Sequence, residues 1–436
     1  MAPLTDTYDE TFLYYIWQYK LLSLTLHTTQ GKPIDIVRTG IRNSEAGADF
    51  LQAEIVIDGI RWVGNVEIHV KSSDWLAHKH HDNPAFENVI LHVVLHYDKK
   101  VFYQNGELIP TLELRDYLPK DLCERYRYLT KSSGWVPCEG IIKPFGYKKR
   151  IWLDRLAVER LESKSERILN LYSQTQGAWV EVLYRLMARY FGGKTNGDPF
   201  EQMAERTPIG IVSKIKDERF RIEALYFGQA GFLSNLTFQD EYPQALAKEY
   251  SYLQKIYHLQ PMNPVVWNFM RQRPYGFPTV RISQWADLLC RSRKLFSYLL
   301  TCPDIKELSE KLSCEASDYW RNHFRFDVST SYKTVSVGKD FIQNLLINAI
   351  FPLVFIYGKE RNQPSLCDYA LQGLDMLPPE KNRNITRWSK MGIRAASAFE
   401  SQALAQLKTQ RCDKFRCLEC TWGHEYLNNA ENKEKH

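Results

Sequence analysis

The sequence predicts an α+β protein: a mixed β-sheet with flanking helices, then a large and mainly helical region, then a short cysteine-rich C-terminal segment. β-rich runs are confined to the first 120 residues, apolar residues at helical spacing dominate after them, and three of the nine cysteines fall between residues 412 and 420. With 436 residues, the chain exceeds the roughly 250–300 residues at which single cores stop growing. We therefore predict three parts, at residues 1–120, 121–408 and 409–436.

In the N-terminal part, two turn signals fix the order of the predicted elements. Asp58-Gly59 separates two β-rich runs and is typical of a tight hairpin. Ser73 is a good N-cap for a helix that follows the second run. This alternation of helix and strand favours a mixed sheet between helices. In chain order, we expect a helix at 8–22, strands at 34–37, 50–57 and 60–70, a helix at 73–81, and strands at 89–95 and 101–103.

The remainder shows helical periodicity without a repeat of fixed period. Prolines within 261–264, 274–278 and 378–379 interrupt the pattern, because proline ends helices. An all-helical domain of roughly 250 residues is expected here. Its clearest helices are predicted at 153–172, 179–191, 245–256, 281–300 and 341–357.

The composition excludes several classes of protein. A hydrophobic content of 44% is ample for packed cores, which excludes extensive disorder before residue 428. No run approaches the roughly 18 apolar residues of a membrane helix and no secretion signal is visible, so a cytoplasmic location without a membrane partner is expected. The net charge of +6 permits nucleic-acid binding without demanding it. The odd number of cysteines argues against a complete set of disulfides.

Histidines and acids concentrate around the second β-rich run. Six of the eleven histidines lie between residues 69 and 96, where an even scatter would place fewer than one. Because side chains alternate along a strand, Glu67, His69 and Lys71 share one face of this run. The hairpin folds Asp49, at the start of the preceding run, back towards Glu67. The sequence therefore predicts a shared pocket for two acids from neighbouring strands.

Two carboxylates beside an imidazole or ammonium group are what metal-assisted phosphodiester hydrolysis requires. Carboxylates bind Mg²⁺ or Mn²⁺, and the ion lowers the pKa of a bound water and neutralises charge on the phosphate. In this interpretation Asp49 and Glu67 hold the ion, and His69 or Lys71 orients the water or stabilises the transition state. Four further residues are candidates for accessory roles: Asp74, His78, Asp82 and His92.

Structural roles are the alternative for the same residues. A histidine on a buried strand is usually hydrogen-bonded within the core, which is the first expectation for His92 and His96. His80 and His81 are expected to be plain surface residues. Inward acids are costly unless they are paired, and three arginines of this region are available partners: Arg38, Arg42 and Arg61.

The arrangement resembles the core of the PD-(D/E)XK nuclease superfamily in the segments 47–50 (Gly-Ala-Asp-Phe) and 64–69 (Gly-Asn-Val-Glu-Ile-His). The resemblance implies a restriction-endonuclease-like fold, with an Asp before one strand, an acid-x-Lys on the next, and an acid or Gln on a helix. Glu10 and Gln18 are candidates for the helical position. Ala48 stands where the family usually has Pro, and His69 stands at the position of the catalytic lysine. Lys71 lies two residues further along the run and on the same face, so it is the candidate substitute for the catalytic lysine.

A second resemblance spans nearly the whole chain. The stretch from Gly64 to Trp75, the histidines that follow it and residues 89–94 are similar to an uncharacterised bacterial family, the domain-of-unknown-function family 2851, found largely in Bacteroidetes. The segments 228–231 and 273–281 are also similar to that family. The resemblance implies a bacterial origin and supplies no established activity.

The C-terminal segment carries a metal-ligand pattern. Cys412-x4-Cys417-x2-Cys420-x3-His424 places four soft donors within thirteen residues, and Cys-x2-Cys at a turn is a frequent Zn²⁺ half-site. A distant cysteine such as Cys367 is the alternative fourth ligand and would suit an iron–sulfur cluster. Incidental thiols are the third alternative. Because a closed cysteine-rich sphere leaves no open position, such a site would be structural.

The helical region contains two further motifs. The segment 228–231 (Gly-Gln-Ala-Gly) lacks the Lys-Ser/Thr of a phosphate loop, so its glycines are expected to permit close helix packing. Arg273, Tyr275 and Arg281 belong to a proline-rich segment that enters a helix. Arginines and an aromatic ring are suited to a nucleic-acid backbone and a stacked base, and a structural loop between helices is the alternative.

Three functions are compatible with these observations. The first is a metal-dependent nuclease that acts on DNA or RNA. The second is a non-catalytic protein on a degenerate nuclease fold that binds nucleic acid or a ribonucleoprotein, which the missing lysine favours. The third is a different metallohydrolase that holds zinc or iron with His78, Asp82 and His92.

Overall fold

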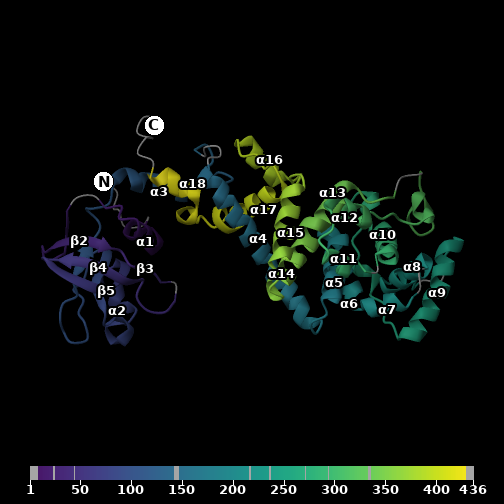
Figure 1. Cartoon of the computed structure of the whole chain (residues 1–436), viewed down its shortest axis with the longest axis horizontal. Helices are drawn as coiled ribbons and strands as arrows, with labels where there is room; N and C mark the ends of the chain where they lie inside the picture. Colours follow the sequence, from purple (N-terminus) through teal and green to yellow (C-terminus); the bar gives the residue numbers. More distant parts are fainter. Residues whose placement is uncertain are drawn as a thin grey trace. The chain divides into compact units, whose positions relative to one another are not determined.

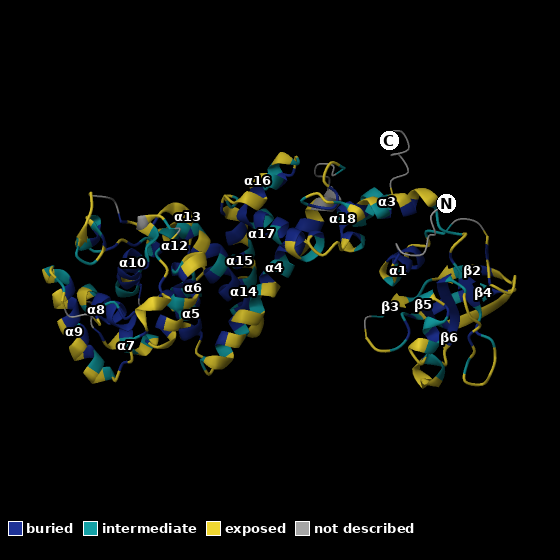
Figure 2. Ribbon diagram, turned by 180° about the vertical axis from the view of Figure 1, so that it is seen from behind, coloured by how far each residue is buried: buried dark blue, intermediate teal, exposed yellow. Residues whose placement is uncertain are grey.

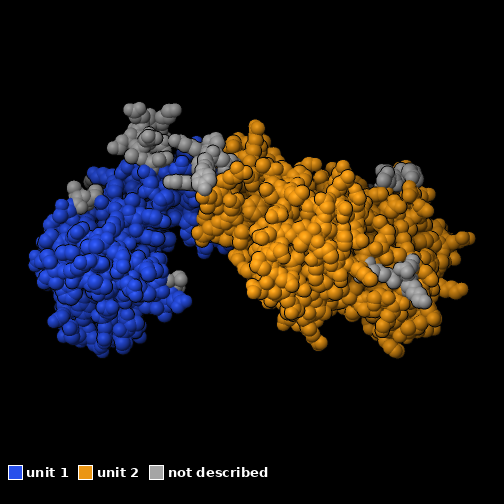
Figure 3. Space-filling view, in the orientation of Figure 1, with its two compact units in different colours: residues 1–149, 408–436 blue, residues 150–407 orange. Residues whose placement is uncertain are grey.

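The computed structural model describes residues 8–22, 25–43, 45–141, 147–215, 218–234, 237–270, 272–292, 294–331 and 335–428. The chain divides into two compact units, which Figure 3 shows in different colours: unit 1 comprises residues 1–149 and 408–436, and unit 2 comprises residues 150–407. The predicted combination of an N-terminal mixed sheet with a large helical region is confirmed.

The domain boundaries differ from those predicted at residues 120 and 409. Helix α3 (Lys120–Lys131) belongs to unit 1, and Arg125 on this helix donates from Nε and Nη2 to the carbonyl oxygen of Leu427 at 3.1 and 2.8 Å. Leu427 lies on α18 (Thr421–Asn428). The C-terminal segment is therefore part of unit 1 instead of a separate tail, and unit 2 is inserted between two stretches of unit 1. Sequence periodicity does not reveal a pairing between segments so far apart.

The sheet of unit 1 has the strand order β1-β2-β4-β5-β6-β7, with β3 also paired to β4. Figure 1 labels β2, β3, β4 and β5 of this sheet. β4 and β5 form the predicted antiparallel hairpin, in which Asp58 and Gly59 have φ values of 53° and 76°, as a type I′ turn requires. β6 runs parallel to β5 and to β7, so the sheet is mixed. The strands are β1 (Leu26–His27), β2 (Pro33–Arg38), β3 (Ile41–Arg42), β4 (Phe50–Ile57), β5 (Ile60–Lys71), β6 (Val89–His96) and β7 (Thr111–Glu113).

β5 is a central strand, and both of its faces are covered. Val66 and Ile68 are buried on one face, and Glu67 and His69 are buried on the other. α1 (Glu10–Gln18) packs against β5 and begins after Asp9, whose carboxylate accepts a hydrogen bond from the Phe12 N–H at 3.0 Å. β6 is buried along nearly its whole length, as is typical of parallel strands between two layers.

The connection from β5 to β6 contains less helix than the sequence predicts. The expected helix at 73–81 is divided into α2 (Asp74–Ala77) and a 3₁₀ turn, η2 (His80–Asp82), because Lys79 between them has a left-handed φ of 59°. The expected strand at 101–103 is reduced to a single bridge between Phe102 and Leu108. The sequence does not predict β7, because three residues are too few to show a period.

Unit 2 consists of helices around a large hydrophobic core, which Figure 2 shows as buried inner faces, together with a short two-stranded ribbon. The expected helix at 179–191 is confirmed, whereas the expected helix at 281–300 is interrupted after residue 291. The elements are α4 (Tyr147–Gln174), α5 (Trp179–Phe191), α6 (Gly193–Glu205), α7 (Ile209–Lys214), α8 (Arg219–Gln229), α9 (Glu241–Tyr257), α10 (Pro278–Arg291), α11 (Leu295–Leu299), α12 (Ile305–Leu312), β8 (His323–Arg325), β9 (Val328–Ser329), α13 (Lys339–Leu345), α14 (Phe351–Glu360), α15 (Pro364–Met376), α16 (Arg383–Lys390) and α17 (Ala398–Leu407).

One stretch of the described chain, Lys339–Glu360, is long and apolar enough to cross a membrane by length and composition. It comprises α13, a π-helical turn and α14. In its most apolar window, 72% of the residues are buried within the protein, so a helix of the unit 2 core accounts for this composition. Asn344 and Asn348 interrupt it, which is why it is not visible in the sequence as an unbroken apolar run.

Two glycines of the segment 228–231 allow the close packing that the sequence predicts. A Cβ on Gly228 would lie 2.0 Å from the ring of Tyr250 on α9. A Cβ on Gly231 would lie 2.2 Å from the carbonyl oxygen of Met262, and its φ of +82° is a conformation that favours glycine. The approach of α8 to α9 therefore depends on the missing side chain at Gly228.

Gly228→Ala is expected to destabilise unit 2 by about 1–3 kcal/mol, because the added methyl group overlaps the Tyr250 ring in a packed core. Urea unfolding of the full chain measures the change. Gly210→Ala is the matched control, since a Cβ there meets no atom within 4 Å and alanine favours helix α7. Equal stability of the two variants would contradict the packing role.

Candidate metal centre

The candidate site lies on the face of β5 that carries Glu67 and His69. Both residues are buried, with exposed fractions of 5% and 2%. A buried carboxylate and a buried imidazole are costly without partners, so their neighbours define the site. Those neighbours come from the residue before β4, from the connection between α2 and η2, from β6 and from α1.

The interruption of the helix after β5 brings two more imidazoles to this face. His78 follows the last turn of α2, Lys79 reverses the chain, and His80 opens η2. The His80 ring stacks on Phe86 with ring centroids 3.8 Å apart, and its edge contact with Trp75 has a centroid distance of 5.3 Å. This aromatic packing fixes the orientation of His80.

Four donor atoms converge at this point. Nε2 of His69 lies 3.1 Å from Nδ1 of His78 and 3.5 Å from Oε1 of Glu67. The same Oε1 lies 3.2 Å from Nε2 of His80, and donor atoms of the three histidines all lie within 4.8 Å of one another. Around an ion with ligand bonds of about 2.0–2.2 Å, adjacent ligand atoms are about 3.0–3.5 Å apart in octahedral or tetrahedral geometry. The three pairs at 3.1–3.5 Å therefore have the spacing of adjacent ligands, and the three histidines form the group whose donor atoms all lie within 4.8 Å.

Two buried imidazoles of the site, His69 on β5 and His92 on β6, have lowered pKa values. Burial, followed by the neighbouring imidazoles, lowers the pKa of His69 to about 2, and burial followed by His80 lowers the pKa of His92 to about 3. At neutral pH one ring nitrogen of His69 therefore carries a lone pair. Nδ1 of His69 lies 2.9 Å from Nε2 of His92, so this contact occupies Nδ1 and leaves Nε2 to face the other donors.

Asp49 directly precedes β4 and contacts Glu67, as the hairpin predicts. The N–H of Asp49 donates to Oε2 of Glu67 at 3.0 Å, and its own Oδ2 accepts from the N–H of Ile68 at 3.0 Å. Its Oδ1 lies 3.1 Å from Nη1 of Arg42, so Asp49 also forms a salt bridge with one of the three arginines that the sequence suggests as partners. Glu67 pairs instead with imidazoles, and Arg38 and Arg61 both pair with Glu54.

A third carboxylate, Glu10 on α1, lies within electrostatic reach of this pair. Burial raises the pKa of Glu10, and the negative charge of Asp49 raises it further. The hydrogen bond that Tyr14 donates to Glu10 at 3.2 Å acts in the opposite direction and lowers the pKa. Burial and then Asp49 also raise the pKa of Glu67, against the hydrogen bond from His80. A cation at the donor atoms would relieve this repulsion between acids. Of the two candidates for the helical acid or Gln, Glu10 is the first residue of α1 and Gln18 is its last.

Several predicted residues lie outside the donor set. Lys71 is exposed at the end of β5, and its backbone N–H donates to the carboxylate of Asp74 at 2.9 Å. Since the chain turns into α2 directly afterwards, strand alternation no longer directs the Lys71 side chain into the site. Asp82 is exposed and pairs with His81 at 3.3 Å, so the structure does not bring it together with the donor set.

The residues predicted to bind nucleic acid lie in unit 2. Arg273 and Tyr275 are exposed, and Nη1 of Arg273 donates to the Tyr275 hydroxyl at 2.9 Å. Arg281 is a packing residue instead: its guanidinium carbon lies 4.0 Å from the centre of the Phe341 ring and it donates to Gln284 at 3.0 Å. Burial lowers the pKa of Arg281 to about 10. Its contacts are therefore within unit 2, and its role in binding nucleic acid stays a prediction.

His80 is the candidate ligand that sequence reasoning missed. It was expected at the surface, whereas its side chain is 12% exposed and faces Glu67. The His-x-His spacing of 78–80 is the available signal. His80 turns towards Glu67 after the left-handed Lys79, and a lysine gives no indication of such a conformation in the sequence. His78 is exposed, and its Nδ1 lies 3.1 Å from Nε2 of His69.

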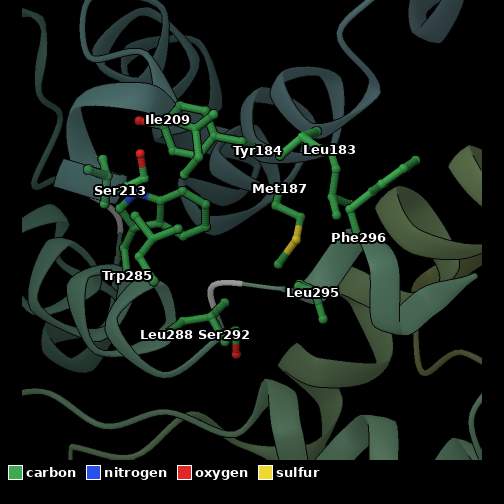
Figure 4. A pocket seen from close by; sticks show the side chains of 13 residues that line it. Leu183, Tyr184, Met187, Ile209, Ser213, Trp285, Leu288, Ser292, Leu295 and Phe296 are labelled. Carbon is green, nitrogen blue, oxygen red and sulfur yellow. The ribbon is translucent and has the colours of Figure 1, made fainter. Parts of the chain in front are cut away.

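A cavity in unit 2 lies between α5, α7, α10 and α11 (Figure 4). Apolar side chains form most of its walls, among them Leu183, Met187 and Trp285, and hydroxyl groups supply the remainder. No carboxylate, imidazole, ammonium or guanidinium group belongs to its described lining, so it lacks charged groups that would bind an ion.

The family model described as "Protein of unknown function (DUF2851)" matches residues 10–383 of the chain. The chain belongs to this family. The second resemblance seen in the sequence is thus confirmed, and the DUF2851 match includes Glu10, all four donor residues and His92, and ends before the C-terminal cysteines. No curated protein and no solved structure matches the chain significantly.

One divalent transition-metal ion per chain is expected to bind with His80 as a ligand. Calorimetric titration of chelator-treated protein with Zn²⁺ and Mn²⁺ measures the affinity. His80→Ala is expected to weaken binding by about 100-fold or more, because even outer-shell partners of a metal contribute about 10–100-fold. His81→Ala is the matched control, since the adjacent His81 pairs with exposed Asp82. Binding that is equal in the two variants would exclude His80 as a ligand.

The metal-free protein is expected to lose stability as the pH falls below 6.5, the ordinary pKa of histidine. His69 and His92 stay neutral in the folded chain down to pH values of about 2 and 3, whereas the unfolded chain binds protons below 6.5, so acid favours unfolding in this window. Urea unfolding between neutral and acidic pH, with a chelator present, measures the slope. His92→Gln is expected to reduce it, and an unchanged slope would assign the acid sensitivity to other groups.

Proposed function

We propose that unit 1 is a metal-dependent hydrolase that cleaves phosphodiester bonds in nucleic acid. The observation that carries the proposal is the group of His69, His78 and His80, whose donor atoms lie within 4.8 Å of one another, with Oε1 of Glu67 beside Nε2 of His69 and Nε2 of His80. A bound divalent ion lowers the pKa of a coordinated water and neutralises charge that develops on phosphate oxygens. The remaining residues then serve to hold the donors and the substrate.

The donor set favours a transition metal over magnesium. The sequence alone indicates Mg²⁺ or Mn²⁺ on two carboxylates, whereas three imidazole nitrogens and one carboxylate suit Mn²⁺, Fe²⁺ or Zn²⁺. Magnesium prefers oxygen ligands in octahedral geometry. Asp49 lies beside the donor set, because Arg42 and the N–H of Ile68 already bind its oxygens.

The surrounding residues have separate roles in this proposal. His92 holds the ring of His69 so that Nε2 faces the ion. Glu10, whose pKa is raised by burial and by Asp49, is suited to accept a proton from the attacking water. Arg42 has 34% of its side chain exposed beside Asp49, and a guanidinium in this position is suited to bind a phosphate.

The order of the acids supports a PD-(D/E)XK-like core. Glu10 lies on a helix, Asp49 precedes one strand of the hairpin, and Glu67 lies on the other strand. The main departure is His69, which stands at the lysine position and acts here as a neutral ligand.

A non-catalytic protein that binds nucleic acid or a ribonucleoprotein is the second candidate. His69 is neutral and Lys71 is exposed, so the site lacks the ammonium group of the nuclease pattern. Exposed groups such as Arg273 and Tyr275 would then contribute salt-dependent contacts and stacking, and Glu67 would not be required.

Glu67→Gln is expected to reduce cleavage by about 100-fold or more, because glutamine keeps the shape of the side chain and removes the charge that holds the ion. The assay uses labelled single- and double-stranded DNA and RNA with Mn²⁺, with Zn²⁺ and with EDTA. Glu107→Gln is the matched control, because Glu107 is exposed in the loop before β7. Circular dichroism verifies that both variants are folded.

The expected result is cleavage by the native chain and by Glu107→Gln, abolished by EDTA and by Glu67→Gln. A native chain that leaves every one of these substrates intact with both metals overturns the hydrolase proposal. In that event, salt-dependent binding of the same nucleic acids that persists in Glu67→Gln supports the binding role.

A further inference from the structure

Four cysteines from two distant stretches of the chain lie within unit 1. Cys138 follows α3, Cys412 ends the π-helical turn η8 (Lys408–Cys412), Cys417 opens the 3₁₀ turn η9 (Cys417–Glu419), and Cys420 precedes α18. All four residues are buried, with exposed fractions of 8–9%, and none forms a disulfide. The sequence pattern identifies the last three and gives no sign of the first.

The backbone holds these segments together. Nζ of Lys408 lies 5.2 Å from the centre of the Trp135 ring. Trp135 lies three residues before Cys138 in the sequence. The N–H of Cys420 donates to the carbonyl oxygen of Cys417 at 3.2 Å and closes the tight turn between them. A Cβ on Gly423 would lie 2.0 Å from that carbonyl oxygen, so α18 packs directly on this turn.

The thiols are electrostatic neighbours of one another. The pKa of Cys138 is raised to about 12, mainly by burial and also by the neighbouring thiols of Cys420 and Cys417. The pKa of Cys412 is raised mainly by burial, and also by the neighbouring thiols of Cys420, Cys138 and Cys417. Buried thiols from two packed segments of one unit are a ligand set that a soft metal binds in the thiolate form.

We propose that Cys138, Cys412, Cys417 and Cys420 are the four ligands of a structural soft-metal centre, which holds a zinc ion or an iron–sulfur cluster. Four cysteine thiolates are a common ligand set for both. Cys417-x2-Cys420 supplies the tight-turn half of the site. The π-helical turn before it is a rare element that is frequent at functional sites, and it ends on Cys412.

The charges around the cluster suit this assignment. Lys408 opens the π-helical turn and pairs with Asp413, and it is a favourable electrostatic neighbour of the Cys412 thiolate. Arg411 pairs with Glu419 at 3.5 Å in the same segment. Four thiolates around a divalent ion carry a net negative charge, which the basic side chains of this segment partly balance.

His424, the fourth ligand that the sequence suggests, is directed elsewhere. Its Nδ1 lies 2.8 Å from the hydroxyl of Tyr15 on α1, and its ring packs against Tyr15 and Tyr19 with centroid distances of 5.6 and 4.7 Å. Cys367 belongs to unit 2, where its thiol donates to the carbonyl oxygen of Phe355 at 3.4 Å. The geometry therefore assigns the fourth position to Cys138.

The experiment uses the full chain with His80→Ala as background, so that an ion at the histidine site does not contribute. After anaerobic purification, zinc, iron and acid-labile sulfide are measured per chain, together with thiolate-to-metal absorbance. Either one zinc, with thiolate absorbance after replacement by Co²⁺, or iron with sulfide is the expected result. Cys138→Ser is expected to lose the metal, and Cys302→Ser, at an exposed cysteine of unit 2, is expected to keep it.

Two further variants keep the test decisive if Cys138→Ser does not fold. Cys138→His supplies another metal donor and is expected to retain zinc, and His424→Ala is expected to retain whichever metal the native chain holds. Metal that persists in Cys138→Ser but is lost in His424→Ala overturns the proposal. So does a native chain that contains neither metal, or one that contains a disulfide among the four cysteines.

Discussion

Burial of Glu67 and His69 on a central strand is the constraint on which unit 1 depends. β5 is covered on both faces, so the alternation that buries Val66 and Ile68 also removes a carboxylate and an imidazole from water. Such groups remain buried only when each has a polar partner. The partners come from the start of β4, from β6 and from the reversed turn at Lys79. The site is therefore a condition for packing this sheet as well as a place for chemistry.

The local part of this arrangement is predictable from the sequence. A hairpin signal and a period of two are local features, and together they place Asp49 beside Glu67 and give His69 the same face. The remainder depends on features that local patterns do not record. His80 enters the site through a left-handed lysine, and Cys138 meets the C-terminal cysteines only because the segments around α3 and α18 pack together.

The helical unit shows the same division between local and long-range information. Periodicity locates helices that have one buried face, such as α5, but not α8, where every residue from 222 to 229 is buried and no apolar stripe remains. Arg281 shows that a sequence pattern does not determine whether a charged side chain packs within the protein or faces a ligand. A guanidinium beside prolines and an aromatic residue suggests a ligand-binding surface, whereas this one covers Phe341, and only the tertiary contact distinguishes the two.

The inserted position of unit 2 has a consequence for the order of folding. Unit 2 is continuous in sequence, so its core is able to form while the chain is still being synthesised. Arg125, by contrast, reaches its carbonyl partner only after Leu427 has left the ribosome. Unit 1 therefore completes its fold after unit 2, because it needs segments from both sides of residues 150–407.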